Sequence, residues 1–241
     1  MTATIDGGEF KATVGGTSKC AALKPDKGST DLKVKGGKIT GDISGVAGKI
    51  INCAGNIKIS GGTIDVTATG TDAEIIVSDK KIEISDGSIT LHGSEDCINA
   101  AGDITISGGE IYCESTGGDG IDSNGNITIS GGKVICYTTA VEEDNAGSTG
   151  LDVNSGYTMT ISGGVVVALG GPNSTFHGVT GSDIFLADMS NAQLNGAEYS
   201  GKTLTIGGEE ITLPEITAES ISLLYYPYAV HTPKAMRLLV K

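Results

Sequence analysis

The chain has 241 residues, and its 29 acidic residues against 16 basic ones give a net charge of −13. This balance argues against nucleic acid and against an anionic membrane surface as partners, since both attract basic patches. Glycine is abundant (38 residues) and proline scarce (5), and the glycines recur periodically, which excludes collagen-like and disordered chains. No apolar run approaches the ~18 residues of a membrane span, so we expect no membrane insertion.

The pattern Ile-x-Ile-Ser-Gly-Gly-x-Ile recurs along the chain. Clear copies occupy residues 57–64, 104–111 and 127–134, weaker copies 32–39, 82–89 and 159–166, and partial copies 4–10 and 204–211. β-Branched residues alternate on both sides of the Gly-Gly bend, which predicts strand, turn and strand, and no segment has a helical period. The central copies lie about 22 to 25 residues apart, so each copy is one coil of a solenoid.

We therefore predict an all-β fold, a single-stranded right-handed parallel β-helix over residues 1–213, with a degenerate coil near 184–186. Residues 214–241 do not repeat and are rich in Tyr, and we expect them to cap or flank the same domain. Neighbouring coils should lie ~4.8 Å apart, with like positions in register. One predicted inward column contains Ile64, Ile89 and Ile111.

The five cysteines do not form a disulfide scaffold, because their number is odd and none belongs to a C-x-x-C pair. Cys113 and Cys136 fall in a second inward column beside the first. We predict that both are buried free thiols that pack as small hydrophobic side chains.

A second motif precedes each bend: an apolar residue followed by an amide or a carboxylate. The apolar residue points inward and the next one outward, so the motif predicts one outward polar column, interrupted by Val77. Its members are Asn52, Asn99, Asp122 and Asp152, with Lys24 as a looser first member. Matching loop positions hold Asp96 and Asp119, and the long loop at 138–150 adds Glu142, Glu143 and Asp144.

Asp122 and Asp152 are expected roughly 5 Å apart on neighbouring coils. Like charges this close repel, so either one carboxylate is protonated or a cation lies between them. An oxygen-only ligand set without His or Cys suits Ca²⁺. The alternative is a solvated acidic face with ladders of Asn and Asp hydrogen bonds and no metal.

Tyr112 and Tyr137 are predicted to point outward beside aliphatic neighbours, where tyrosine rings could stack on sugars. Lys133 follows the bend on the same part of the coil, and we include it with Tyr112 and Tyr137 among the candidate carbohydrate-binding residues. The alternative is that the C-terminal segment covers this patch. For His92, His177 and His231 we expect surface or tail roles, and no Ser-His-Asp arrangement can be placed.

The string of residues 118–132, Gly-Asp-Gly-Ile-Asp-Ser-Asn-Gly-Asn-Ile-Thr-Ile-Ser-Gly-Gly, resembles the secreted bacterial parallel β-helix proteins described as carbohydrate-binding domain-containing. The resemblance is strongest over residues 30–168. It implies a fold similar to that of pectate lyases, binding of cellulose and of acidic, pectin-type sugars, and bound Ca²⁺. By position it implies calcium ligands at Asp96, Asn99, Asp119, Asp122 and Asp152. The chain departs from the family where Asn99 replaces an acidic residue and where Val77 breaks the column.

Lyases of this fold class use a Lys or Arg base beside a calcium-bound uronate. Lys24 is several coils from the acidic residues and Lys133 lies on a different face, so we predict a binding module rather than an enzyme. The alternatives are a polysaccharide lyase, a glycoside hydrolase with paired carboxylates, and a structural spacer in a larger surface protein. We expect a secreted or cell-surface protein, although no signal peptide is recognisable at Met1.

Overall fold

The computed structural model describes residues 1–17, 19–25, 30–140, 147–171, 174–181, 184–188, 197–200, 203–206, 209–213 and 221–225. This part of the chain contains strands and no helix, as the all-β prediction requires. It accordingly holds no helix that is long and apolar enough to cross a membrane.

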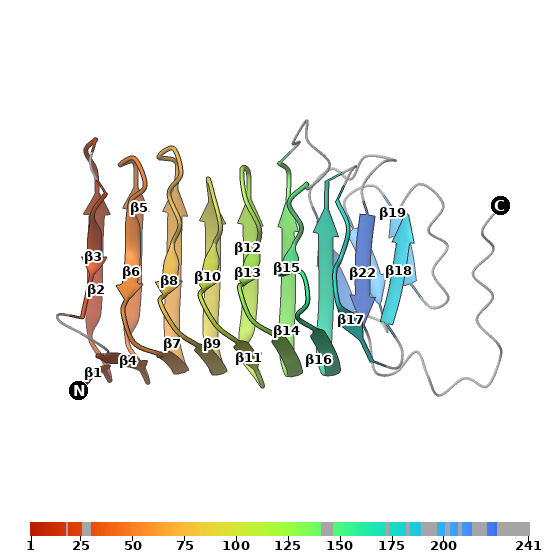
Figure 1. Ribbon diagram of the computed structural model, residues 1–241, viewed down its shortest axis with the longest axis horizontal. Coiled ribbons are helices and arrows are strands. Elements are labelled where there is room, and N and C mark those ends of the chain that lie inside the picture. The colour runs from red at the N-terminus through yellow and green to blue at the C-terminus, as the bar shows by residue number, and fades with distance from the viewer. Residues whose placement is uncertain are drawn as a thin grey trace.

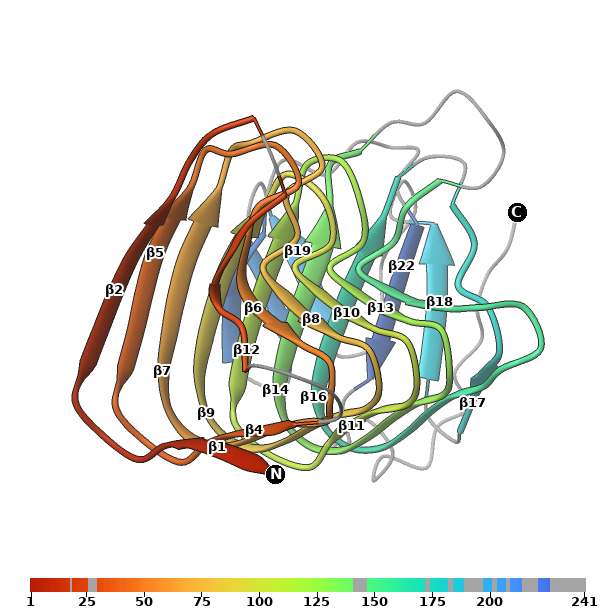
Figure 2. The ribbon, with the colours of Figure 1, turned by 60° about the vertical axis from the view of Figure 1, so that its left-hand side comes forward.

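The strands stack as the coils of a solenoid, from the N-terminal coil at one end of Figure 1 to the last coils at the other. The largest sheet contains β1 (Thr2–Ile5), β2 (Glu9–Val14), β4 (Asp31–Val34), β5 (Lys38–Ile43), β7 (Ile57–Ala68), β9 (Ile82–Gly93), β11 (Ile104–Ile106), β12 (Glu110–Ser115), β14 (Ile127–Thr138), β16 (Met159–Gly170), β17 (Val179–Thr180), β18 (Ile184–Asp188) and β22 (Ile221–Tyr225). A six-stranded sheet contains β3 (Ala21–Leu23), β6 (Lys49–Cys53), β8 (Ile76–Ser78), β10 (Ile98–Ala100), β13 (Ile121–Ser123) and β15 (Leu151–Val153). Figure 2 shows these two sheets as separate faces of the same coils.

The parallel register confirms the predicted columns. Ile64 pairs with Ile39 on one side and with Ile89 on the other, and Ile89 pairs with Ile111. These side chains are at most 2% exposed. Burial of one β-branched or aliphatic side chain per coil in each column, at ~25 cal/mol per Å² of apolar surface, is the main favourable contribution to the free energy of folding.

The Gly-Gly bends allow the coils to approach one another closely. Gly62 has φ +88°, and a Cβ atom there would lie 2.9 Å from the backbone of Gly36 and Gly37 on the preceding coil. Gly132 repeats this geometry, with φ +88° and a Cβ position 2.7 Å from the carbonyl oxygen of Gly109. Glycine is therefore required at these positions both by the backbone conformation and by the stacking.

The core contains free thiols, as predicted for Cys113 and Cys136. Both are fully buried, pair in register on β12 and β14, and form no disulfide. Cys53 and Cys97 are also buried and free. The hydrogen bond of the Cys97 thiol to Cys113, together with burial, holds the pKa of Cys97 well above its usual range.

The parallel stacking ends earlier than the predicted boundary at residue 213. Among the described strands, β17 is the last one that adds in parallel to β16, whereas β22 pairs with β16 in antiparallel orientation, with β18 on its outer side. The copy predicted at 204–211 is not a coil: β19 (Ala197–Ser200), β20 (Thr203–Ile206) and β21 (Glu209–Thr212) form a small antiparallel sheet. These residues keep the apolar alternation and a Gly-Gly pair, but they lack the serine that precedes the pair in the clear copies.

Candidate functional site

The predicted outward column lies on the six-stranded sheet. Asn99 pairs with Val77 on one neighbouring coil and with Asp122 on the other, and Asp122 pairs with Asp152. Asn52 pairs with Val77, so the column is interrupted where the sequence predicted. The residues before these side chains are buried, which directs the polar groups outward.

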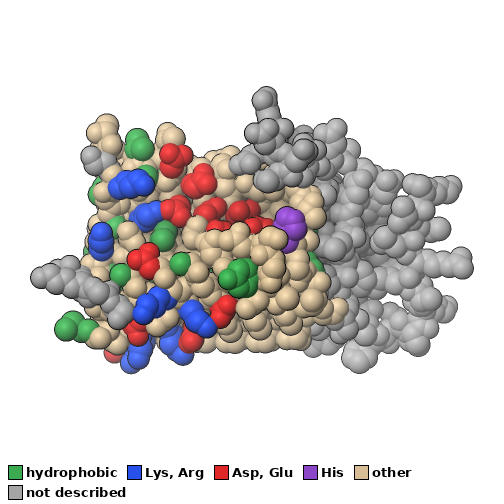
Figure 3. Space-filling view, viewed as in Figure 1, with side chains coloured by type: hydrophobic (Ala, Val, Ile, Leu, Met, Phe, Trp, Pro, Cys, Tyr) green, Lys and Arg blue, Asp and Glu red, His purple; other side chains and the backbone are tan. Residues whose placement is uncertain are grey.

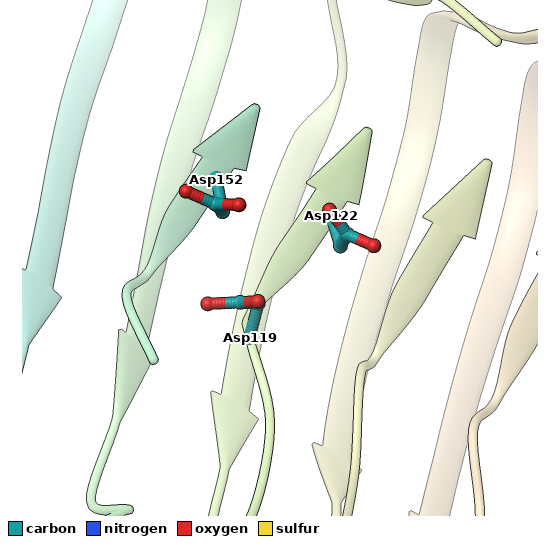
Figure 4. Close-up of side chains that lie close together, drawn as sticks. All are labelled: Asp119, Asp122 and Asp152. Carbon is teal, nitrogen blue, oxygen red and sulfur yellow. The ribbon is translucent and has the colours of Figure 1, made fainter. Parts of the chain in front are cut away.

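Three carboxylates of this region form a compact group, named here the acidic cluster: Asp119, Asp122 and Asp152. One oxygen of each lies within 4.8 Å of one oxygen of the other two. Asp119 precedes β13, Asp122 lies in β13 and Asp152 lies in the neighbouring β15, and Figure 4 shows their side chains grouped on the same face. Figure 3 shows acidic side chains gathered in the middle of this face and Lys side chains gathered nearer its N-terminal end.

Burial makes the charged form of these carboxyl groups costly. Burial first, and then the neighbouring carboxylates, raise the pKa of Asp119 from its usual 3.8 to about 8. The same causes raise the pKa of Asp122 to about 7. Burial also raises the pKa of Asp152, although the nearby His177 opposes the shift. Without a cation, the cluster therefore holds protons at neutral pH that exposed aspartates would release.

Asp96 and Asn99 support the cluster from the preceding coil. The Asp96 carboxylate accepts hydrogen bonds from the backbone N–H of Asp119 (2.8 Å) and from the Asn99 side-chain amide (2.7 Å). The same amide nitrogen donates to Asp122 at 3.2 Å. Asp96 is only 8% exposed and lies outside the group of mutually close oxygens. The structure thus brings both predicted residues to the site, as hydrogen-bonding neighbours of the cluster.

A basic residue lies closer to the cluster than the sequence predicted. The His177 Nδ1 atom is 3.7 Å from an Asp152 carboxylate oxygen, and the side chain is 58% exposed, which agrees with the surface role expected for this histidine. His177, Asp119 and Asp152 line a pocket of about 180 Å³ together with Ser148, Asn154 and Thr175. His177 follows the last repeat, so no periodic pattern could have located it.

The donor set of the cluster consists of oxygens only. Three carboxylates can offer both of their oxygens, and a Ca²⁺ site takes about 6–8 oxygen ligands, some of them from water. Among the described residues, no thiolate or imidazole belongs to the group of mutually close atoms, which favours a hard cation over zinc or copper. Glu143 and Asp144, also predicted as ligands, lie outside the described residues.

The matching positions predicted for Asp96 and Asp119 extend to two earlier coils. Lys49, Glu74, Asp96 and Asp119 each stand two residues before the buried residue of the second motif. Lys49 forms an ion pair with Glu74 on the next coil. The sequence analysis did not name Lys49 and Glu74, although the same spacing to the buried Ile51 and Ile76 was visible in the sequence.

The predicted carbohydrate residues lie on the large sheet. Tyr112 is partly buried, whereas Tyr137 is 3% exposed and packs in a cluster with Leu204, Ile211 and Leu213. The prediction that Tyr137 forms part of a sugar-binding platform is therefore wrong, because the antiparallel strands β20 and β21 cover this side chain. Covering by the C-terminal segment was the alternative prediction, and among the described residues Leu204, Ile211 and Leu213 cover this patch. Lys133, half-buried on β14, is aligned with Glu110 and Val165, and its role stays a prediction.

A protein-family model described as carbohydrate-binding domain-containing protein matches residues 31–171, more than half of the chain. The chain belongs to this family. The matched range of this carbohydrate-binding domain includes the whole acidic cluster as well as Tyr112, and it ends before the antiparallel strands. Searches of curated proteins and of solved structures found no match. Polysaccharide binding is therefore the function that the family supports.

Proposed function

We propose that this carbohydrate-binding domain is a calcium-dependent module for acidic, uronate-type polysaccharides, acting outside the cell or at its surface. The observation that carries the proposal is the acidic cluster: three carboxylates from adjacent coils, with oxygens within 4.8 Å of one another. Such a group is unfavourable when ionised and becomes favourable when a divalent cation neutralises it. In this proposal Asp119, Asp122 and Asp152 would hold Ca²⁺.

The charge of the domain supports a role for the cation in sugar binding. A chain of net charge −13 repels a polyuronate unless a cation lies between the two anions. Ca²⁺ bound at a partly exposed cluster keeps open coordination positions that a sugar carboxylate can fill. The pocket beside Asp119 and Asp152 carries Ser148, Asn154 and His177, whose polar groups suit sugar hydroxyls and carboxylates.

Calcium titration calorimetry of the Asp122→Asn variant tests the metal. We expect Ca²⁺ affinity to fall at least about tenfold, because a carboxylate ligand becomes a neutral amide. The control is Asp103→Asn, which removes the same charge at an ion pair with Lys81 away from the cluster and should leave Ca²⁺ affinity unchanged. Wild-type protein that takes up no Ca²⁺ at millimolar concentration would refute the proposal.

Affinity measurements on polygalacturonate, with Ca²⁺ and then with EGTA, test the ligand. We expect binding in Ca²⁺ and its loss in EGTA and in Asp122→Asn. Retention on neither pectin nor cellulose, with or without Ca²⁺, would instead favour the structural spacer. Binding to polygalacturonate that EGTA does not change would show that the cluster has no part in it.

The lyase alternative gains one candidate base from the structure. His177 lies beside Asp152 at the rim of the pocket, where a base could remove the proton next to a cation-bound uronate carboxylate. Absorbance of the unsaturated product from polygalacturonate and Ca²⁺ tests this alternative. Steady product formation that His177→Ala abolishes would make the protein a lyase, and no product would leave it a binding module.

A further inference from the structure

The outward face of the large sheet changes at Tyr112 from accessible and polar to covered and apolar. On the next coil Ile135 and Tyr137 are buried beneath Leu204, Ile211 and Leu213. Tyr112 packs against the edge of that cluster and stays partly exposed. On the N-terminal side of Tyr112, the outward positions are polar and are half-buried or exposed among the described residues: Thr90, Thr67 and Asp65. This face is therefore polar and accessible as far as Tyr112, and the covering strands begin on the next coil.

Two aromatic rings lie next to the covering strands. Tyr112 on β12 and His92 on β9 both point outward, because their neighbours Ile111, Cys113 and Leu91 are buried. The two ring centroids are 5.7 Å apart and the ring planes are tilted by 57°. The His92 side chain is 41% exposed. Tilted, partly exposed rings of this kind present apolar faces with polar edges, which is the surface that a sugar ring stacks on.

Hydrogen bonds fix both rings. The His92 Nδ1 atom lies 2.8 Å from the Glu114 carboxylate, and the hydroxyl groups of Tyr112 and Tyr137 are 2.5 Å apart. Rings that are already held lose little conformational entropy when a ligand binds. Stability alone gives little reason for the pair of His92 and Glu114, because ion pairs near the surface contribute little to the free energy of folding.

The surrounding groups favour a sugar without charge. Asp65 and Glu110 are exposed on the same outward face and the Glu114 side chain is 29% exposed, so these carboxylates outnumber Lys133, which is aligned with Glu110 on the next coil. Carboxylates accept hydrogen bonds from sugar hydroxyls, but they repel the carboxylates of a polyuronate. The acidic cluster lies on the other sheet of the same coils.

We propose that the face formed by His92, Tyr112 and Glu114 is a second carbohydrate site, which binds a neutral polysaccharide without calcium. This inference rests on the family's carbohydrate binding and not on the proposed calcium site. A neutral sugar ring stacks on Tyr112 and His92, and its hydroxyls donate to the carboxylates of Glu114 and Glu110.

The test is calorimetric titration in EGTA with three neutral oligosaccharides: cellohexaose, xylohexaose and mannohexaose. We expect saturable binding of at least one of them, with affinity lowered about tenfold in His92→Ala and in Tyr112→Ala, the loss of one stacking partner. Tyr112→Phe is the matched control, since it keeps the ring and should keep most of the affinity. Thermal melts monitor folding, and the exposed His92 variant serves if Tyr112→Ala does not fold.

Three results would overturn the proposal: no binding of any neutral oligosaccharide, unchanged affinity in both alanine variants, or affinity lost in EGTA or in Asp122→Asn. The calcium proposal is tested separately, by calcium uptake and by binding to polygalacturonate. Neutral-sugar binding with no calcium uptake would reject the calcium proposal alone and leave this site supported.

Discussion

Asp119 has two roles at one carboxylate. It accepts a hydrogen bond from the backbone N–H of Thr149 at 2.5 Å, which ties β13 to the following coil, and it belongs to the acidic cluster. The hydrogen bond lowers its pKa, but burial and the neighbouring carboxylates raise it by more. The side chain that joins two coils thus also has a pKa well above that of an exposed aspartate.

A pH dependence of stability follows from this carboxyl group. Unfolded Asp119 has a pKa near 4, and the folded value is about 8. Between these values the folded state keeps a proton that the unfolded chain has released, so rising pH favours unfolding. We expect the free energy of unfolding, measured by urea denaturation in EGTA, to fall between about pH 4 and pH 8.

The control for this prediction is Asp119→Asn, which cannot titrate and should show a flatter pH profile. Saturating Ca²⁺ should also flatten the wild-type profile, because a bound cation keeps the carboxylates ionised. A wild-type stability in EGTA that rises over this pH range would contradict the pKa assignment.

Within the elements, side chains join one coil to the next through the backbone. The Asp31 carboxylate accepts the N–H of Asn56 at 2.8 Å, and the Asp103 carboxylate accepts the N–H of Asn126 at 3.0 Å. The Asn126 side-chain oxygen in turn accepts the N–H of Thr158 at 3.0 Å. Each such bond satisfies a backbone donor at the start of a strand, so these ladders hold the register between coils.

A glycine of a Gly-Gly bend and a glycine outside the bends provide a matched pair of substitutions. Gly132 and Gly156 have nearly the same φ, +88° and +91°, but a Cβ atom meets the backbone of Gly109 at 2.7 Å in the first and nothing within 4 Å in the second. We expect Gly156→Ala to cost about 1–2 kcal/mol, for the left-handed conformation alone. Gly132→Ala should cost roughly 3 kcal/mol or more, since the coils must also separate. Equal losses in chemical denaturation would contradict this account of the bend.

The repeating elements could be predicted because each coil obeys the same physical demands. Inward Ile64, Ile89 and Ile111 must be apolar and the bend must be glycine, so both signals recur at the coil period. The column at Asn99, Asp122 and Asp152 followed directly from that register. Sequence periodicity was therefore sufficient to predict the central part of the fold and most of the acidic cluster.

Contacts made by non-repeating segments could not be predicted in this way. His177 reaches Asp152 from beyond the last repeat, and its contact depends on the course of a single loop. Tyr137 has the alternation of an outward residue, and only the antiparallel strands that fold back over it make it buried. The direction of β22 also has no sequence signal, because parallel and antiparallel strands share the same side-chain period.

At the scale of the whole molecule, each coil contacts only its neighbours, so stability should vary along the axis. β9 is paired on both sides, by β7 and by β12, whereas β2 is paired with β5 alone among the described strands. We expect amide hydrogens of β9 to exchange more slowly than those of β2 by at least about tenfold. Native-state hydrogen exchange measures this, and equal protection of the two strands would contradict independent coil opening.

The direction of the inter-coil hydrogen bonds has a mechanical consequence. These bonds lie across the strands and therefore along the long axis of the solenoid. A pull on the chain along that axis strains the hydrogen bonds of one coil at a time, so the coils separate one after another. A pull across the axis strains the bonds of many residues together. The solenoid should therefore resist a pull along its strands better than a pull along its axis.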